Sequence, residues 1–177
     1  MPHLYEISIV KMSREVFLVS ACLLGIPCAY DGRGRPVEEL LTLATRGLVV
    51  PVCPEVLGGL PIPRPTAEIV GGDGTDVLAG QARVVTVEGG DVTDAYVRGA
   101  EGALAAASRH EIAAAILKQR SPSCGDKWVY DGTHSGNLKE GQGVTAALLR
   151  RHGVVVWSED DLSRIFERDD AVIEIGQ

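Results

Sequence analysis

Four short apolar runs, separated by patterns of helical period, constrain the fold of this chain more than any other feature. They lie at residues 16–21, 48–52, 113–117 and 154–157, and they are rich in the β-branched residues typical of strands. The first run is almost continuously apolar, as expected for a strand covered on both faces. Strands that alternate with helices are typical of parallel sheets. The sequence therefore predicts an α/β fold: a single three-layer Rossmann-like domain with a mostly parallel sheet and helices on both faces.

Helical spacing and capping residues predict where the covering helices lie. Proline suits the first turn of a helix, and a hydroxyl or carboxylate suits the position that caps it. A serine followed three residues later by an acid forms a capping box. The first expected helix begins near Pro36, with Leu40, Leu43 and Ala44 on one face, and the second spans residues 91–110 with Asp91 or Thr93 as its cap. The third carries Val144, Ala147 and Leu148. The fourth follows Ser158, with Asp161 completing a capping box and Leu162, Ile165 and Phe166 facing inward.

Two stretches of the sequence show no helical spacing of apolar residues. Residues 54–76 are rich in proline and glycine and are predicted to be a long irregular loop, a type that is usually functional. A second glycine-rich loop is expected from Gly125 to Gly143. Residues 82–87 are predicted to form a strand that pairs as a hairpin with the residues near Ile69. The run 71–74 (Gly-Gly-Asp-Gly) is not interpreted as a dinucleotide-binding turn, because no strand is expected before it and no helix after it.

Charge and length limit the classes of function. The chain has 177 residues and a net charge of −7, so it lacks the basic field that holds a nucleic-acid polymer. Residues 1–14 show neither a signal peptide nor a span long enough for a membrane, and they are predicted to be an N-terminal extension. Residues 15–177 are predicted to be one domain. We expect a cytoplasmic protein with a small-molecule partner and no membrane association; the oligomeric state stays open.

Three of the four cysteines follow predicted strands. Cys22 and Cys53 come directly after strands, and Cys124 comes one short turn after a third. Because ligands bind outside the carboxyl ends of the strands in open parallel sheets, we expect these thiols to converge on one crevice. A single buried cysteine is usually a small apolar core residue. Three in this position, beside proline, glycine and polar residues, indicate a metal or sulfur site.

The spacing of the cysteines matches no compact metal motif. Structural zinc sites usually contain C-x₂₋₄-C pairs, and ferredoxins contain C-x₂-C-x₂-C runs; this sequence has neither. Cys22 and Cys28 are the nearest pair. Structural disulfides are not expected in a reducing compartment. Gly25, Gly58, Gly59 and Gly125 are expected to let the chain approach a bulky ligand closely.

Other polar residues give weaker signals. Arg33, Arg35, Arg64 and Lys118 are candidates for binding an anionic or carbonyl group, although exposed charge is their ordinary role. Asp31 and Asp131 each precede a glycine, so turn formation explains them. No histidine has a ligand-like partner in the sequence. The aromatic residues in suitable loops for a planar ligand are Tyr30, Trp128 and Tyr130.

These blocks also carry a resemblance to a known family. They are Ser20-Ala21-Cys22-Leu23-Leu24-Gly25, Cys28-x-Tyr30-Asp31-Gly32, Cys53-Pro54-Glu55-x-x-Gly58-Gly59-Leu60-x-x-Pro63-Arg64-x-x-x-Glu68 and Leu117-Lys118-x-x-Ser121-Pro122-Ser123-Cys124-Gly125. Over residues 16–159 the chain resembles a small bacterial family, long catalogued as a domain of unknown function, whose characterised members are thiouracil desulfurases. The sequence departs from the family at Ala29, where many relatives carry arginine, a difference that bears on ligand preference.

The resemblance implies a [4Fe-4S] cluster held by Cys22, Cys53 and Cys124, with one iron open to substrate. It also implies that Glu55 is the acid/base residue and that Ser121 positions substrate or water. Cys28 would then lie near the site without being a ligand. The expected reaction is non-redox removal of sulfur from a thiolated nucleobase or a related thioamide, in which Glu55 activates water and hydrogen sulfide is released.

Two alternatives use all four thiols. One is a four-cysteine zinc protein, structural or hydrolytic, with Cys28 as the fourth ligand. The other is an iron–sulfur protein with a regulatory or electron-transfer role. Cys28 distinguishes them from the desulfurase: a spare Cys28 leaves an open iron, whereas a fourth ligand closes the site.

Overall fold

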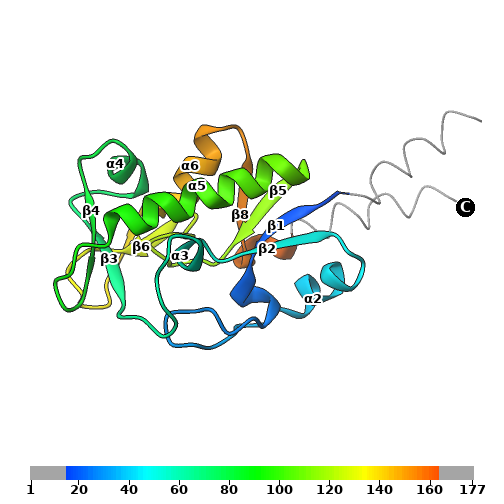
Figure 1. Cartoon of the computed structure of the whole chain (residues 1–177), viewed down its shortest axis with the longest axis horizontal. Helices are drawn as coiled ribbons and strands as arrows, with labels where there is room; N and C mark the ends of the chain where they lie inside the picture. Colours follow the sequence, from blue (N-terminus) through cyan, green and yellow to red (C-terminus); the bar gives the residue numbers. More distant parts are fainter. Residues whose placement is uncertain (1–14, 164–177) are drawn as a thin grey trace, which may run out of the picture.

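Four parallel strands form the central sheet (Figure 1). The computed structural model of the chain describes residues 15–163. The strand order is β2-β1-β5-β8, and each neighbouring pair is parallel. The strands are β1 (Phe17–Ser20), β2 (Val49–Val52), β5 (Ala114–Leu117) and β8 (Val155–Ser158). Each of the four predicted apolar runs is therefore a strand of one sheet.

Helices cover both faces of the sheet. On one face, Val19 and Ile116 pack against Leu40 and Leu43 of α2 (Glu38–Thr45). On the other face, Leu18, Ala115 and Leu117 pack against α5 (Thr93–His110) and α6 (Val144–Arg151), which Figure 1 shows on the side opposite α2. Side chains that alternate along each strand thus serve two separate cores. The predicted three-layer α/β architecture is confirmed.

Two small hairpins stand beside the main sheet. β3 (Ala67–Val70) and β4 (Arg83–Thr86) pair antiparallel, which confirms the predicted hairpin near Ile69. β6 (Trp128–Tyr130) and β7 (Leu138–Glu140) form a second antiparallel pair. The prediction of one irregular loop from Gly125 to Gly143 was wrong there, because each strand of this pair has only three residues and gives no pattern to detect.

The predicted irregular loop at 54–76 is also more ordered than expected. It contains α3 (Pro54–Leu57), β3 and the start of α4 (Gly74–Leu78). A strand therefore precedes the 71–74 run and a helix follows it, so the reason given against a dinucleotide turn was wrong. Asp73 caps α4 in a capping box with Asp76, and this local hydrogen bonding explains the run.

Two details of helix capping differ from prediction. α2 begins at Glu38 with Val37 as its N-cap, two residues after Pro36. The N-cap of α5 is Val92, so neither Asp91 nor Thr93 occupies that position; the Asp91 carboxylate instead accepts hydrogen bonds from the amide and hydroxyl of Thr93. The short 3₁₀ helix η2 (Glu159–Asp161) has the predicted capping box of Ser158 and Asp161.

Helices α3 and α5 cross with their backbones in contact. A Cβ at Gly58 would lie 1.9 Å from the carbonyl oxygen of Ala95, and one at Gly99 would lie 1.9 Å from that of Pro54. Only glycine fits at this crossing. Gly58 therefore serves a helix contact and not the predicted approach of the chain to a ligand. Gly125 likewise packs within its own loop, Gly25 takes φ +80° at the end of η1 (Ala21–Leu24), and Gly59 takes φ +91° after α3.

Residues 1–14, predicted to be an N-terminal extension, and Ile165 and Phe166, predicted to face inward, lie outside the described residues. Leu162, predicted to face inward with them, is buried. Within residues 15–163, the structure contains no helix with the length and hydropathy of a membrane span.

Candidate iron–sulfur active site

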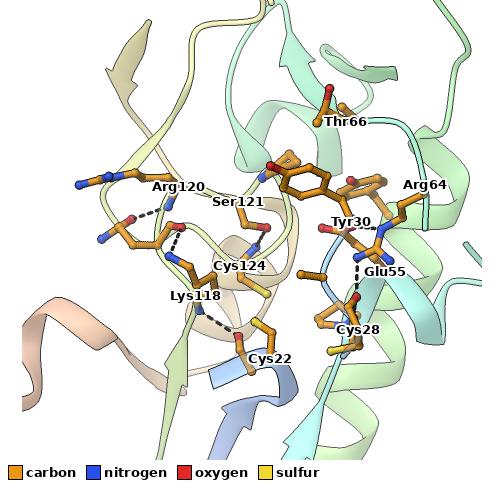
Figure 2. A pocket seen from close by; sticks show the side chains of 18 of the residues that line it. Cys22, Cys28, Tyr30, Glu55, Arg64, Thr66, Lys118, Arg120, Ser121 and Cys124 are labelled. Carbon is orange, nitrogen blue, oxygen red and sulfur yellow. Dashed lines mark hydrogen bonds and ion pairs between the residues drawn. The ribbon is translucent and has the colours of Figure 1, made fainter. Parts of the chain in front are cut away.

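A cavity of about 450 Å³ lies at the carboxyl ends of β1, β2 and β5. The sulfur-bearing residues Cys22, Cys28, Cys53 and Cys124 all line it, and all four are free thiols. β1 and β5 are neighbours in the sheet but far apart in sequence, and β2 pairs with the other side of β1. The predicted convergence of three strand-end cysteines on one crevice is thus observed, and Cys28 joins them (Figure 2).

Cys22 sits in η1, two residues after Ser20, the last residue of β1. Its carbonyl oxygen accepts hydrogen bonds from the amides of Gly25 and Arg35, at 3.1 and 2.7 Å, which fold the 25–35 loop back onto η1. Gly34 meets Gly25 at this point, because a Cβ on Gly34 would lie 2.3 Å from the Gly25 carbonyl oxygen. Burial, followed by the proximity of Cys53, raises the pKa of the Cys22 thiol to about 11 against the opposing charges of Lys118 and Arg35.

Cys53 and Cys28 form a hydrogen-bonded thiol pair. The hydrogen bond from Cys28 lowers the pKa of the Cys53 thiol to about 6, with smaller contributions in the same direction from the Val56 amide and Arg64. The same bond, followed by burial, raises the pKa of Cys28. Cys53 Sγ also lies 3.6 Å from the Cys28 carbonyl oxygen, a contact in which only a protonated Cys53 can donate. Since Arg64 donates to that carbonyl at 3.0 Å, ionised Cys53 leaves no acceptor unsatisfied.

Cys124 lies in a loop that two side chains hold in place. The Ser121 hydroxyl oxygen accepts the amides of Ser123 and Cys124, each at 3.1 Å. The side-chain oxygen Oε1 of Gln119 accepts the backbone amides of residues 120, 126, 127 and 128 at 3.0–3.3 Å. Cys124 is buried, and this burial raises the pKa of its thiol while a hydrogen bond with Ser20 opposes the rise.

Glu55 is held on the opposite side of the cavity from Cys124, in the first turn of α3 (Figure 2). One of its carboxylate oxygens accepts from Arg64 Nε, and Tyr96 lines the same cavity. Arg64 is buried and donates further to the carbonyls of Pro61 and Cys28, at 3.2 and 3.0 Å. Burial raises the pKa of Tyr96 well above its usual value. Glu55 is thus a carboxylate fixed by a buried guanidinium.

Lys118 marks another charged edge of the site. Its ammonium pairs with Glu159 and donates to the backbone carbonyl of Gln119 at 3.2 Å. The second carboxylate oxygen of Glu159 accepts the backbone amide of Gln119 at 2.7 Å. Among the described residues, the cavity wall includes Arg35, Arg64, Tyr30 and Tyr130 but neither Arg33 nor Trp128. Asp31 and Asp131 each accept a backbone amide two residues on, which confirms their predicted turn role.

Several site residues were missed by sequence reasoning. Gln119 and Tyr96 gave no local signal, because their role depends on tertiary contacts alone. Ser20 belongs to the first block of the family resemblance, but nothing in the pattern separates it from a strand residue. Glu68 is buried and accepts the amides of Gly132 and His134, at 2.9 and 3.0 Å, with His134 Nδ1 3.8 Å away. His134 therefore has an acidic partner after all.

Within the described residues, no three His, Cys, Asp or Glu side chains lie close enough to hold a single metal ion. A cubane cluster is wider than one ion, so its ligands stand further apart around it. Thiolates are the donors that iron–sulfur clusters use. The four free thiols around one buried cavity therefore fit the donor chemistry of a cluster better than that of an isolated cation.

Comparisons with known proteins agree with this geometry. The family model described as 2-thiouracil desulfurase matches residues 17–161. The protein YbbK of Bacillus subtilis (strain 168) is 48% identical over 150 residues, which cover 85% of this chain and 99% of YbbK. A solved structure of the [4Fe-4S]-dependent thiouracil desulfidase TudS is similar with a TM-score of 0.79 and 43% identity, over 89% of this chain and 99% of that one.

The family match spans the sheet, the cavity and all four thiols, and the resemblance predicted from the sequence blocks is confirmed by it. The same match supports the predicted enzyme class, a desulfurase, at the level of the family. This chain therefore belongs to the 2-thiouracil desulfurase family.

Proposed function

We propose that this protein is a [4Fe-4S]-dependent desulfidase that removes sulfur from thiouracil or a similar thiolated pyrimidine without net oxidation or reduction. The observation that carries the proposal is the single cavity lined by Cys22, Cys53, Cys124 and the clamped Glu55. The similarity to TudS, described as [4Fe-4S]-dependent, supports the choice of cofactor.

Cys22, Cys53 and Cys124 are the proposed ligands of the cluster. Cys22 and Cys53 lie within two residues of the ends of β1 and β2, and Cys124 lies in the loop after β5 that Ser121 and Gln119 hold in place. Cys28 is the proposed spare thiol, because it is the second cysteine of the segment after β1, where Cys22 already supplies a ligand, and the family resemblance does not count it among the ligands. When bound, a cluster with one open iron supplies a soft Lewis acid for the substrate sulfur.

Glu55 is the proposed general base. A water near this carboxylate gives up one proton to it as the water oxygen bonds to the C=S carbon. The carbon–sulfur bond then breaks, and the sulfur leaves as hydrogen sulfide with the two protons of the water. Oxygen replaces sulfur at the carbon, so no external electron donor or acceptor is needed. Arg64 holds the carboxylate in place for this transfer.

Ser121 is proposed to position the substrate as a hydrogen-bond donor. Its oxygen already accepts two backbone amides, so the remaining capacity of the hydroxyl is its single proton. Tyr30 and Tyr130 line the cavity and offer planar faces for a pyrimidine ring. The partner is thus a small molecule, and the negative net charge gives no support to binding of a nucleic-acid polymer.

The test is anaerobic purification followed by iron, sulfide and zinc analysis and an assay of 2-thiouracil turnover with detection of hydrogen sulfide. We expect iron and sulfide to accompany activity, and Cys28→Ala to keep both. Glu55→Gln should keep the cluster and lose roughly 10²–10⁴-fold in turnover, while Glu39→Gln, on α2 away from the cavity, should match the unmodified protein. Stoichiometric zinc in a colourless protein would overturn the proposal.

The same measurements decide between this proposal and the two alternatives that use four thiols. A zinc site of four cysteines needs all four around one ion, and the described residues hold no such group. An electron-transfer cluster held by four cysteines requires Cys28. Loss of the cluster in Cys28→Ala would therefore favour the electron-transfer alternative.

A further inference from the structure

Glu68 is a buried carboxylate in the wall of the cavity. Its neighbours Ala67 and Ile69 on β3 belong to one hydrophobic core, so the alternation of side chains along a strand turns Glu68 to the opposite face. The residue is only 7% exposed, and it lines the cavity. A carboxylate removed from water needs hydrogen-bond donors, because an unpaired one destabilises the fold.

The donors come from residues 131–137, the turn that joins β6 to β7. Oxygen Oε2 of Glu68 accepts the backbone amides of Gly132 and His134, at 2.9 and 3.0 Å. Nδ1 of His134 lies 3.8 Å from the other carboxylate oxygen, Oε1. β3 and β6 lie side by side (Figure 1), so one side chain of β3 holds the turn that follows β6.

The backbone of this turn is suited to a close approach and depends on outside contacts. A Cβ at Gly132 would lie 2.5 Å from the carbonyl oxygen of Ile69, and Gly132 takes φ +88°. His134 takes φ +56°, a left-handed conformation that is uncommon for a residue with a side chain. Such a conformation persists only where surrounding contacts determine it, and the two hydrogen bonds to Glu68 are contacts of this kind.

The turn also carries part of the cavity wall. Tyr130 directly precedes it and Gly136 lies within it, and both line the cavity. Tyr130 is one of the two aromatic side chains that are proposed above to face the pyrimidine ring. The position of this side of the wall thus depends on a carboxylate from a different element.

We propose that Glu68 is a positioning residue that keeps the 131–137 turn, and with it Tyr130, in the place where substrate binds. The inference rests on the proposed function and extends it to a residue that sets substrate affinity and is not a cluster ligand. If the turn occupies this place only part of the time, the apparent affinity falls in proportion to that fraction. Loss of the Glu68 carboxylate should therefore raise KM and leave kcat nearly unchanged.

Three variants separate the two hydrogen bonds from the other properties of Glu68. Glu68→Gln keeps a side-chain oxygen that can accept both amides, whereas Glu68→Leu removes the acceptor and leaves a side chain of similar size. Lys139→Met is the matched control. Lys139 Nζ holds the same hairpin by donating to the carbonyl of Gly72 at 2.7 Å, and it lies outside the described cavity wall.

The experiment measures KM and kcat for 2-thiouracil and the iron content of the anaerobically prepared enzymes, together with amide hydrogen exchange in residues 131–137. We expect Glu68→Leu to raise KM roughly 10-fold, the factor that corresponds to the loss of one hydrogen bond to a charged group. Its kcat and iron content should stay close to those of the unmodified enzyme, and the turn should exchange faster. Glu68→Gln should restore most of the affinity, and Lys139→Met should retain it.

The outcomes separate this inference from the proposed function. An unmodified protein without a cluster or without turnover overturns the proposed function, and this role of Glu68 with it. An active enzyme whose KM is unchanged in Glu68→Leu, or is raised equally in Glu68→Gln or Lys139→Met, overturns only the role of Glu68. A lower kcat at an unchanged KM would overturn it as well.

A measurement that leaves Glu68 in place covers the case in which Glu68→Leu does not fold. Among the described residues, the Ser135 amide makes no hydrogen bond, although it belongs to the same turn. In the unmodified protein, NMR should therefore show slower exchange for the amides of Gly132 and His134 than for that of Ser135. Equally fast exchange of all three amides would overturn the inference.

Discussion

Arg64 satisfies three acceptors with one buried guanidinium: the Glu55 carboxylate and the carbonyls of Pro61 and Cys28. It therefore connects the proposed base to the segment that carries Cys28. Sequence reasoning placed Arg64 among general anion-binding candidates and did not pair it with Glu55. The pairing depends on how residues 58–66 fold, and nothing in their composition specifies that path.

Arg64→Ala should lower the free energy of unfolding of the metal-free protein by about 3 kcal/mol, because it takes this donor from the largely buried Glu55 carboxylate and from two carbonyls. Denaturant unfolding under reducing, anaerobic conditions measures the change. Arg35→Ala, which breaks a more exposed pair with Asp31, is the control and should unfold almost as the unmodified protein does. Equal destabilisation by the two variants would contradict a stabilising role of the buried Arg64–Glu55 pair.

Cys53 should be the most reactive thiol of the metal-free protein. Its pKa falls from about 9 to about 6, whereas the pKa values of Cys22, Cys28 and Cys124 are raised. A lowered pKa means that the thiolate persists as the pH drops, and only the thiolate is alkylated. At pH 7 iodoacetamide should therefore label Cys53 first, and its rate should halve as the pH falls to about 6.

Peptide mass spectrometry across this pH range checks the order of labelling. Cys28→Ala removes the hydrogen-bond donor, so the pKa of Cys53 should rise and its labelling at pH 7 should slow. Faster labelling of Cys22 or Cys124 than of Cys53 would show that the pair does not form.

At the level of elements, the crossing of α3 and α5 determines where Glu55 lies. α5 is rich in alanine and glycine, a composition that favours close packing against neighbouring elements. The sheet does receive Ala103 and Ala107, but the closest approach is between Gly99 of α5 and Pro54 of α3. Composition therefore predicted that the helix packs tightly without identifying the short helix that meets it, because α3 has only four residues.

Gly99→Ala should destabilise the protein by roughly 1–3 kcal/mol and lower turnover as well, because the new Cβ pushes α3 and its Glu55 away from α5. Thermal unfolding and the 2-thiouracil assay measure the two effects. Gly102→Ala lies one turn further along α5, where a Cβ meets Leu57 at an ordinary 3.4 Å. Alanine favours helix there, so this control should be neutral or slightly stabilising. If Gly99→Ala is destabilised but its turnover is unchanged, the crossing of α3 and α5 supports packing without determining the position of Glu55.

Across the whole molecule, the sheet brings together residues that are far apart in sequence. Alternating apolar runs and helical patterns were sufficient to predict a parallel sheet, and the rule that ligands bind at the carboxyl ends of its strands was sufficient to predict the convergence of Cys22, Cys53 and Cys124. Ser20, Gln119 and Tyr96 could not be predicted, because each acts through a contact between segments whose mutual distance appears only after folding.

This arrangement gives a prediction for the whole chain. A cluster bound by three thiolates would join the segments that follow the neighbouring strands β2, β1 and β5 at the carboxyl edge of the sheet. Any group that binds only the folded state stabilises it, and the gain is concentrated in the segments it connects. Cluster removal under anaerobic conditions should therefore speed amide hydrogen exchange in residues 22–35, 53–60 and 118–128.

The strands β1 and β5 hydrogen-bond to each other and α5 is hydrogen-bonded within itself, so their amides should keep most of their protection. Comparison of loaded and metal-free protein by hydrogen-exchange mass spectrometry measures both groups of segments in one experiment. Loss of protection spread evenly over sheet and loops would mean that the cluster supports the entire fold. Loss confined to the three loops would mean that the sheet folds without the cluster, and that the cluster orders the loops that carry its thiols.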